Sequence, residues 1–514
     1  MKKILAVFLV FVLLLAGCQK AEETPVIEGT KINLSDKEIT VDGNAVTTDS
    51  SQAVYTANDI VFYLEGQDFT YGEGEKADEH TQEEADAHTV VHISKPGTYV
   101  LSGELSKGQI AVDLGEDAET NPEAVVTLVL NDVDVTCTVA PAVIFYNVYE
   151  CGVADEETAT KDVNTSKAGA NVVIADGTEN NINGSYVAKI YKSYELNEEG
   201  TEVVDSKKLH KYDAAFYSKK TMNVNGGEKG DGILNIKAEN EGLDSELHLT
   251  INGGNINITS GNDGINTNED NVSVTTINGG SLNIICDGST GEGDGIDSNG
   301  WLVINGGSVT AQACATSGDA GIDSDKGIYI NGGTVCATGN MLDQIAGGNQ
   351  TYAVFTFAGR QGGNNVYYLK NTDNKVVGEY KPTNDFTYMI IAGDYLAEGD
   401  YTFWVDDTQL SGVKTQMGNM GGMMPPDMNG ELPEGEQPNR GEMPEDFRPQ
   451  QGERPEMPED LTPPEGMENM IPPEGFDKGD KGQFGGMQNN GEASTTFTIV
   501  TGANQFIGLA PATA

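Results

Sequence analysis

The sequence predicts an all-β protein whose main part is a parallel β-helix, a solenoid of short strands, followed by a small antiparallel β module. Three observations predict this fold: a recurring Asn-Gly-Gly phrase, alternation of apolar and polar residues after each copy, and the lack of a helical period. The copies begin at Asn225, Asn252, Asn278, Asn305 and Asn331, at steps of 27, 26, 27 and 26 residues. A repeat of this length, made of strands punctuated by glycine, corresponds to one turn of a solenoid.

Composition indicates how the rest of the chain is organised. Two lysines and a short apolar run directly before Cys18 predict a lipoprotein signal peptide, with Cys18 as the lipidated residue. The run is too short for a transmembrane helix, which needs about 20 residues. We expect, in chain order, a signal peptide 1–17, a lipid-anchored tether 18–30, an N-terminal β or cap region with an acidic loop 31–89, the β-helix 90–340, the β module 351–410, a disordered Pro/Met/Glu/Gly-rich segment 411–492, and a C-terminal strand region 493–514 that docks on the module.

A second phrase, Gly-Ile-Asp-Ser or a close variant, precedes most copies of Asn-Gly-Gly. It stands at 242–245, 264–267, 295–298 and 321–324, and Phe216-Tyr217-Ser218 is a degenerate first copy. Stacked coils should align the polar residues around this phrase in two columns. The first column would hold Glu241, Asp263, Asp294 and Asp319, and the second Asp244, Asn266, Asp297 and Asp323.

Carboxylates in neighbouring coils call for a cation between them. Equivalent residues of stacked coils lie about 4.8 Å apart, where two carboxylates repel by about 3.5 kcal/mol at an effective dielectric constant of about 20. Calcium takes about six to eight oxygen ligands from carboxylates, amides and main-chain carbonyls, a mixture that such turns supply. We therefore expect Ca²⁺ to be held by residues of the set Asp244, Asp263, Asn266, Asp294, Asp297, Asp319 and Asp323. The alternative is that these residues are solvated turn formers.

The asparagines of the Asn-Gly-Gly phrase predict a structural feature. Each asparagine stands at a bend before two glycines, and glycine adopts a positive φ without steric cost. Because the copies are equivalent in successive coils, their side-chain amides should form a stacked, hydrogen-bonded ladder inside the turn.

Charge and composition limit the function. A formal net charge of -50 excludes a direct electrostatic role on nucleic acid or anionic lipid, and it would repel an acidic ligand. The four arginines lie outside the coils, which argues against a lyase with an arginine base. A lysine base, or a pair of carboxyls for an inverting hydrolase, stays open. Three aromatic residues beside strand starts could be sugar-stacking platforms or could pack on a sheet face: Trp301, Tyr329 and Tyr217.

The order of motifs resembles a known family. The series "GTYVLSGEL", "VTLVLNDVDVT", "APAVIFYN", "ADGTENNING" and "DAAFYSKKTMNVNGG", followed by the serial "GLDS" or "GIDS" and "INGG" phrases, resembles the carbohydrate-binding lipoprotein family of anaerobic Gram-positive bacteria over roughly Val90 to Gly339. The resemblance implies a right-handed parallel β-helix with bound calcium, similar in shape to pectate lyases, that binds cellulose and acidic sugars such as polygalacturonate. The positions that match the calcium-associated turns of the family are Asp263, Asp294, Asp297 and Asp323, whereas position 266 has Asn where its neighbours have Asp.

Three function classes follow. The favoured one is a non-catalytic, surface-anchored, calcium-dependent polysaccharide-binding protein, a monomer held at the extracellular face of the cell membrane by its lipid. Calcium held partly by protein carboxylates could keep an open position for a sugar carboxylate, which would overcome the charge repulsion. The alternatives are a polysaccharide lyase or hydrolase acting on pectin, and an adhesin or structural envelope protein whose calcium is structural.

Overall fold

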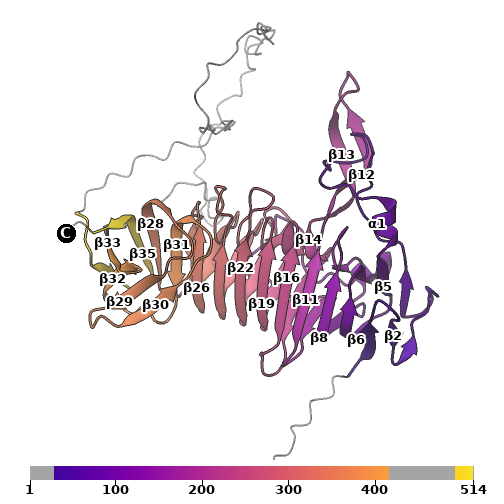
Figure 1. Ribbon diagram of the computed structural model, residues 1–514, viewed down its shortest axis with the longest axis horizontal. Coiled ribbons are helices and arrows are strands. Elements are labelled where there is room, and N and C mark those ends of the chain that lie inside the picture. The colour runs from indigo at the N-terminus through magenta and orange to yellow at the C-terminus, as the bar shows by residue number, and fades with distance from the viewer. Residues whose placement is uncertain (1–27, 416–491, 513–514) are drawn as a thin grey trace, which may run out of the picture. The chain divides into compact units, whose positions relative to one another are not determined.

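The computed structural model describes residues 28–415 and 492–512 and shows an all-β chain (Figure 1). Apart from a short α-helix, α1 (Gln82–Asp86), and a 3-10 helix, η1 (Glu116–Thr120), the regular elements of this part are strands. The predicted all-β class is confirmed. No helix of these two ranges is long and apolar enough to cross a membrane. The predicted signal peptide with Cys18, and nearly all of the segment 411–492, lie outside the described residues.

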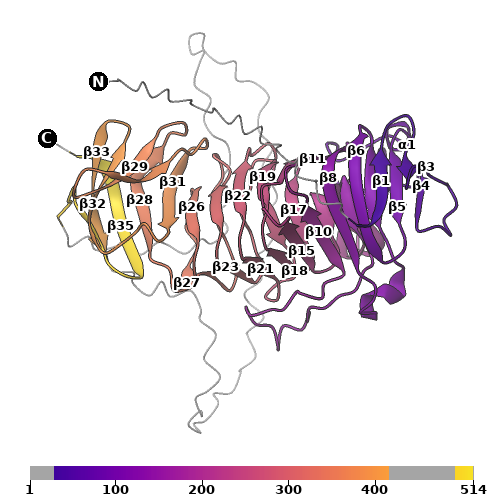
Figure 2. The ribbon, with the colours of Figure 1, turned by 90° about the horizontal axis from the view of Figure 1, so that it is seen from below.

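One run of the large sheet consists of parallel strands, each paired with a strand of the following repeat (Figure 2). Val224 lies opposite Ile251, Ile251 opposite Ile277, and Ile277 opposite Ile304, and all four side chains are buried. The same apolar position of each repeat therefore forms a column inside the core. The run comprises β1 (Thr30–Leu34), β6 (Gly97–Leu105), β8 (Val126–Thr136), β10 (Ala170–Ile174), β15 (Met222–Gly226), β18 (His248–Ile251), β21 (Val274–Ile277), β23 (Trp301–Ile304), β25 (Gly327–Ile330) and β27 (Ile345–Gly347).

A second run of parallel strands begins with β11, which pairs with the later part of β8. It consists mainly of the segments of alternating polarity that follow Asn-Gly-Gly. In β19, Ile256 and Ile258 are buried while Asn257 between them is exposed, as a strand with one covered face requires. The run comprises β11 (Glu179–Gly184), β16 (Ile233–Ala238), β19 (Asn255–Ser260), β22 (Ser281–Cys286), β24 (Ser308–Gln312) and β26 (Thr334–Gly339).

A separate seven-stranded sheet carries the Gly-Ile-Asp-Ser phrases. It runs through β4 (Val54–Ala57), β5 (Thr89–Ile93), β7 (Gly108–Val112), β9 (Val143–Phe145), β14 (Ala214–Ser218), β17 (Glu241–Ser245) and β20 (Ile265–Thr267). All its pairs are parallel except β4 with β5, and a parallel bridge from Ile265 to Ile296 extends the pattern by one repeat. Leu243, Ile265, Ile296 and Ile322 are fully buried, so the apolar residue of each phrase points into the core.

The large sheet contains parallel and antiparallel pairs, which differs from the predicted solenoid of parallel strands with a separate antiparallel module. At its beginning, β2 (Thr40–Val41) pairs antiparallel with β1 and with β3 (Asn44–Ala45). At its other end, β31 (Phe386–Ala392) pairs antiparallel with β26 and so joins the C-terminal module to the same sheet. The physical reason is that the last strand of a parallel stack has unpaired N–H and C=O groups, which would template pairing with other chains unless another segment covers them.

The predicted ladder of asparagine side chains is confirmed, but the prediction that it lies inside the turn is wrong. Asn252 donates from Nδ2 to Oδ1 of Asn225, Asn278 to Asn252, and Asn305 to Asn278, each at 2.9 Å, and Asn331 donates to Asn305 at 2.8 Å. These side chains are partly or fully exposed and not enclosed within the turn.

We expect Asn278→Ala to lower the free energy of unfolding by about 1 kcal/mol, because it removes two ladder hydrogen bonds, each with a net contribution of about 0.5 kcal/mol or more. The matched variant Asn331→Ala removes only the last bond and should have about half the effect. Denaturant unfolding of both variants measures the difference. Equal losses would show that the amides act singly and not as a ladder.

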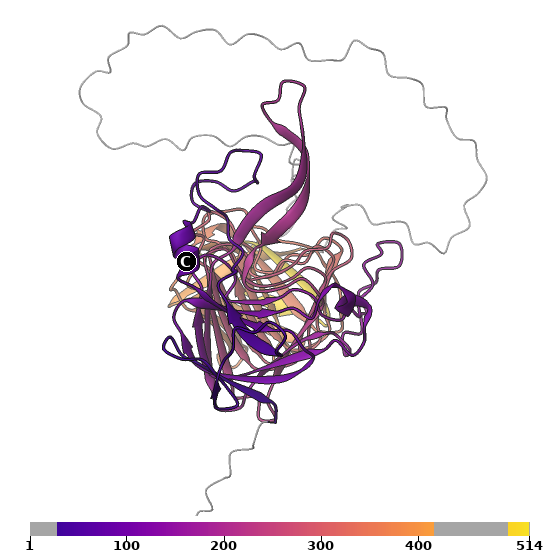
Figure 3. The same cartoon turned by 90° about the vertical axis from the view of Figure 1, so that its right-hand side faces the viewer.

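Two segments differ from the sequence-based expectations. The acidic stretch Glu73 to Ala87, predicted to be a loop, contains α1, whose capping box is formed by Thr81 and Glu84. The Thr-x-x-Glu signature for this cap is in the sequence. In addition, β12 (Val187–Leu196) and β13 (Val203–Tyr212) form a two-stranded antiparallel hairpin, which stands away from the stacked strands in Figure 3.

The C-terminal module has an aromatic core of its own. Phe355 stacks on Phe403 with ring centroids 4.4 Å apart, and Phe497 and Phe506 pack against Phe355. The last strands pair with the module, and one pair, β28 with β35, is parallel, so the module is not purely antiparallel. Its strands are β28 (Tyr352–Gln361), β29 (Tyr367–Asn371), β30 (Val376–Tyr380), β31, β32 (Gly399–Val405), β33 (Thr408–Thr415), β34 (Phe497–Ile499) and β35 (Ala503–Pro511).

Candidate functional site

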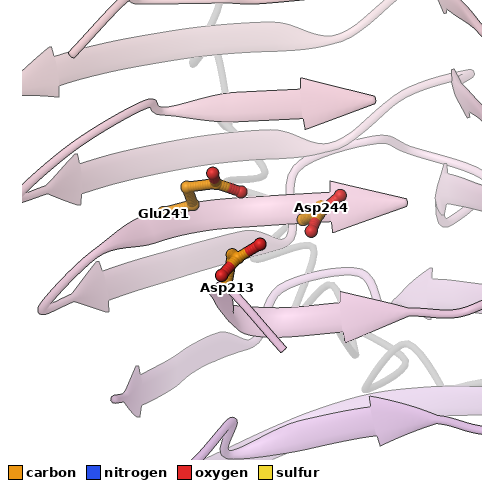
Figure 4. A group of neighbouring side chains, drawn as sticks. All are labelled: Asp213, Glu241 and Asp244. Carbon is orange, nitrogen blue, oxygen red and sulfur yellow. The ribbon is translucent and has the colours of Figure 1, made fainter. Parts of the chain in front are cut away.

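Three acidic side chains of neighbouring repeats meet inside the protein (Figure 4). Glu241 and Asp244 belong to β17, and Asp213 directly precedes β14, which pairs with β17 so that Ala214 lies opposite Glu241 and Tyr217 opposite Asp244. One carboxylate oxygen from each lies within 4.8 Å of the others. The residues are 7%, 6% and 0% exposed for Asp213, Glu241 and Asp244. We call this group the acidic triad.

Neighbouring groups satisfy only part of the triad's hydrogen-bonding capacity. Asn266 donates from Nδ2 to Oε1 of Glu241 at 3.2 Å, and Asn268 donates from Nδ2 to both carboxylate oxygens of Asp244 at 2.9 Å. Lys211 forms an ion pair with Asp213 at 2.7 Å. Oε2 of Glu241 and Oδ1 of Asn266 are buried and have no hydrogen-bond partner in the described residues. Two buried acceptors without donors are costly unless something else binds them.

Burial and mutual repulsion dominate the electrostatics of the triad. Burial, followed by the charges of Asp244 and Asp213, raises the pKa of Glu241 well above its ordinary value. Burial, followed by the charges of Glu246 and Asp213, does the same to the pKa of Asp244. Burial also raises the pKa of Asp213, despite the opposing effect of Lys211. When all three carboxyls of the triad are ionised, Lys211 neutralises only one of the three buried negative charges. A divalent cation would offset the other two.

The chemistry of the donor set fits a hard cation. Calcium–oxygen distances of about 2.3–2.6 Å allow ligand oxygens up to about 5 Å apart across the ion, consistent with the triad. The triad carboxylates and the free Oδ1 of Asn266 are oxygen donors, and no thiolate or imidazole belongs to the group. The acidic triad could therefore hold a metal ion, with Asn266 as a further ligand.

The second predicted column exists in the structure. Asp244 lies opposite Asn266 in the register of β17 and β20, and the bridge of Ile265 with Ile296 places Asn266 opposite Asp297. Asp323 donates its backbone N–H to the Ile296 carbonyl at 2.7 Å, as Asp297 does to that of Ile265 at 2.8 Å, so the column reaches Asp323. Of these residues, only Asp244 belongs to the triad.

The first column is used mainly to tie the coils together. Oδ1 of Asp263 accepts the Asp294 backbone N–H at 2.7 Å, and Oδ1 of Asp294 accepts that of Ala320 at 2.5 Å. Asp319 lies one position before the column, because the backbone bonds place Ala320 opposite Asp294, and its Oδ2 accepts the Gly293 N–H at 2.6 Å. These carboxylates order the turns whether or not they also bind a metal.

Several of these carboxylates have strongly raised pKa values. Burial, followed by the charges of Asp263 and Asp323, raises the pKa of Asp294 to about 9. Burial raises the pKa of Asp263 to about 7, against the backbone hydrogen bond from Asp294. Burial and Asp323 raise that of Asp297 to about 7. The pKa of Asp323 itself is raised, mainly by burial. The acidic character of this part of the core therefore extends well beyond the triad.

Sequence reasoning missed part of this site. Asp213 stands before the degenerate first copy of the phrase, and the recurring pattern gives no reason to select it. Glu241 belongs to the predicted first column but not to the predicted metal ligands. Asp343, whose pKa burial and Asp323 raise to about 7, comes after the last copy of the repeat. The detectable signal was the eight-residue step from Phe216 to Val224, which marks the coil that contributes Asp213.

The three aromatic candidates differ in exposure. Tyr217 is 1% exposed, and its hydroxyl donates to Glu246, so the prediction of an outward sugar platform is wrong for Tyr217. The reason is that Tyr217, which alternates with the inward-pointing Phe216, lies on the opposite side of β14 and is covered there, where it packs against Tyr212 at the end of β13. Trp301 and Tyr329 are partly exposed, and Nζ of Lys161 lies 5.3 Å from the ring centroid of Tyr329. Their role in sugar binding stays a prediction.

Comparison with known proteins identifies the family of the chain. A solved structure titled as that of the polysaccharide lyase-like protein from C. thermocellum, gadolinium derivative, shares 18% sequence identity, with 62% of this chain and 99% of that chain covered and a TM-score of 0.31. No curated protein matches the chain. The family model for carbohydrate-binding domain-containing proteins matches residues 87–350, which are 264 of the 514 residues and include the acidic triad. The chain belongs to the carbohydrate-binding domain-containing family.

Proposed function

We propose that the protein is a non-catalytic polysaccharide-binding protein of the cell surface, anchored as a monomer by a lipid on Cys18, and that it binds acidic plant cell-wall polysaccharide, polygalacturonate, or cellulose in a calcium-dependent manner. The observation that carries the proposal is the buried acidic triad inside the region matched by the carbohydrate-binding family. Paired parallel strands at successive repeats support a right-handed parallel β-helix as the framework.

Calcium is the cation that we propose for the triad. The donors are carboxylate and amide oxygens, burial and mutual repulsion disfavour three charged carboxylates without a cation, and calcium tolerates irregular oxygen sets where magnesium demands a tight octahedron. Asp213, Glu241, Asp244 and Asn266 would hold the ion. Asp263, Asn266, Asp294, Asp297, Asp319 and Asp323 remain candidates for further ions along the columns.

Metal binding also answers the charge problem. A chain with a net charge of -50 should repel polygalacturonate, which carries a carboxylate on each sugar. Calcium in the buried triad reduces the local negative charge, and a further ion at the partly exposed Asp297 or Asp323 would accept a sugar carboxylate at an open coordination position. Binding of the acidic polymer should then depend on calcium.

The test is retention of the chain from Gln19 onward on polygalacturonate and on cellulose, with calcium and after removal of metal with EDTA, while the supernatant is assayed for released sugar. We expect retention on at least one polymer with calcium, a loss of at least about tenfold in EDTA, and no sugar release. Retention on neither polymer would contradict the proposed function. Unsaturated product or new reducing ends would instead establish a lyase or hydrolase.

A further inference from the structure

The outer face of one sheet of the C-terminal module carries two aromatic rings side by side. In the antiparallel pair of β29 and β32, Tyr368 lies opposite Trp404, and Lys370 lies opposite Thr402. The alternating residues Tyr367, Leu369 and Phe403 are fully buried in the aromatic core. Tyr368, Lys370 and Trp404 therefore point away from that core, and all three are partly exposed. We call this set the aromatic platform.

The platform is ordered by contacts among its own members. Nε1 of Trp404 donates to Oγ1 of Thr402 at 2.9 Å, which fixes the orientation of the indole. Nζ of Lys370 lies 4.1 Å from the centroid of the Trp404 ring and 5.7 Å from that of Tyr368. Directly opposite residues in an antiparallel pair have Cβ atoms about 4.5–5.5 Å apart. The ammonium group therefore lies over the face of the indole, and the two adjacent rings and Lys370 form one apolar surface that carries a positive charge.

Lys370 supplies the positive charge of the aromatic platform. The sequence has 80 acidic and 30 basic residues, yet no carboxylate of the described residues forms an ion pair with Lys370. The nearby Glu379, opposite Tyr368, is instead paired with Lys381 at 2.6 Å. A lysine without an acidic partner, on a strongly acidic protein, is complementary to an anionic ligand.

We propose that the aromatic platform is a second carbohydrate-binding site, selective for uronic-acid polysaccharide and independent of metal. The C–H face of a pyranose ring would stack on Trp404 and Tyr368, since aromatic rings supply a flat apolar surface, while Nζ of Lys370 would leave the indole face and pair with the sugar carboxylate. The site lies outside residues 87–350, which the family model matches, and needs none of the acidic residues of the triad. It therefore goes beyond the function proposed above.

The two tryptophans of the chain provide the test. In the full chain, Trp301→Phe leaves Trp404 as the sole tryptophan, so that its fluorescence reports on the platform. Titration with hexagalacturonate in EDTA should give a saturable fluorescence change, and Tyr368→Ala in this background should weaken the affinity by about fivefold or more, as expected for loss of a stacking ring. No saturable change in the Trp301→Phe protein would overturn the proposal.

The source of selectivity is tested by Lys370→Met, which keeps a long apolar side chain against the indole and removes the charge. We expect the affinity for hexagalacturonate to fall by up to about fivefold, as expected for the loss of an ion pair at a partly exposed site, and the affinity for cellohexaose to stay the same. Lys375→Met, on an exposed turn of the same module, is the matched control and should change neither affinity. An equal loss for both sugars in Lys370→Met would contradict a carboxylate-binding role. Because these titrations contain EDTA, they are independent of the calcium-dependent function.

Discussion

The variant Asp244→Asn is expected to change stability in opposite directions with and without calcium. Without metal, it removes a fully buried carboxylate whose pKa is raised well above the ordinary value, and asparagine retains an oxygen that can accept from Asn268. The metal-free variant should therefore be more stable than the metal-free wild type, by roughly 1 to 3 kcal/mol at pH 8. With calcium, the variant loses a charged ligand and should gain far less from the ion.

Thermal unfolding in the two states measures this reversal. At a calcium concentration of about 100 times Kd, a ligand that binds only the folded protein stabilises it by about 2.7 kcal/mol. Wild type should gain this amount, and Asp244→Asn should gain little of it. The control is Asp205→Asn, which neutralises an exposed carboxylate on the β12–β13 hairpin and should unfold like wild type in both states. A variant that is less stable than wild type in EDTA would show that Asp244 stabilises the fold without any ion.

The stability of the metal-free protein is expected to fall as the pH rises from about 4 to about 9. Asp263 and Asp297 have pKa values raised to about 7, and Asp294 to about 9, in each case mainly by burial. A carboxyl with a raised pKa in the folded state contributes stability below its unfolded pKa and loses it as the pH passes its folded pKa, because the folded protein binds more protons than the unfolded chain in this range. For Asp297, a shift from 3.8 to about 7 corresponds to about 4 kcal/mol.

Calcium should reverse this trend, because it binds deprotonated carboxylates and its affinity rises with pH. The difference in unfolding free energy between calcium-loaded and metal-stripped protein should therefore be larger at pH 8 than at pH 5. Denaturant unfolding at the two pH values, with and without calcium, gives the four free energies. If the metal-stripped protein were equally stable at pH 5 and pH 8, the pKa values of these carboxyls would not differ between the folded and the unfolded protein.

The parts of the fold that repeat could be predicted from the sequence. The Asn-Gly-Gly copies correspond to a ladder of amides, and Ile265 and Ile296 occupy the same buried position, because a one-residue change in register would expose every apolar side chain. The parts that close the repeat could not. The antiparallel strands β2 and β31 have no counterpart in the recurring phrases, since covering a sheet edge depends on tertiary pairing and not on a local pattern.

The sequence predicts the chemistry of the candidate site better than the residues that form it. The columns indicated buried acidic residues, and Asp244 and Asn266 do contact or belong to the acidic triad. Asp213 comes from a coil whose phrase is degenerate, and its approach to Glu241 depends on the pairing of β14 with β17 across 27 residues. Tyr217 could not be placed without the three-dimensional fold, because the same strand alternation fits a ring packed inside and a ring facing solvent.

The most direct test of calcium-dependent polysaccharide binding is a titration of calcium into metal-stripped protein, in which calcium occupancy is measured by calorimetry and retention on polygalacturonate is measured in the same buffer. Retention should rise with occupancy of the site that Asp244→Asn removes, and that variant should stay unbound at calcium concentrations that saturate wild type. Full retention of metal-stripped wild type, or of Asp244→Asn, would contradict a role for calcium at the acidic triad in binding the polymer.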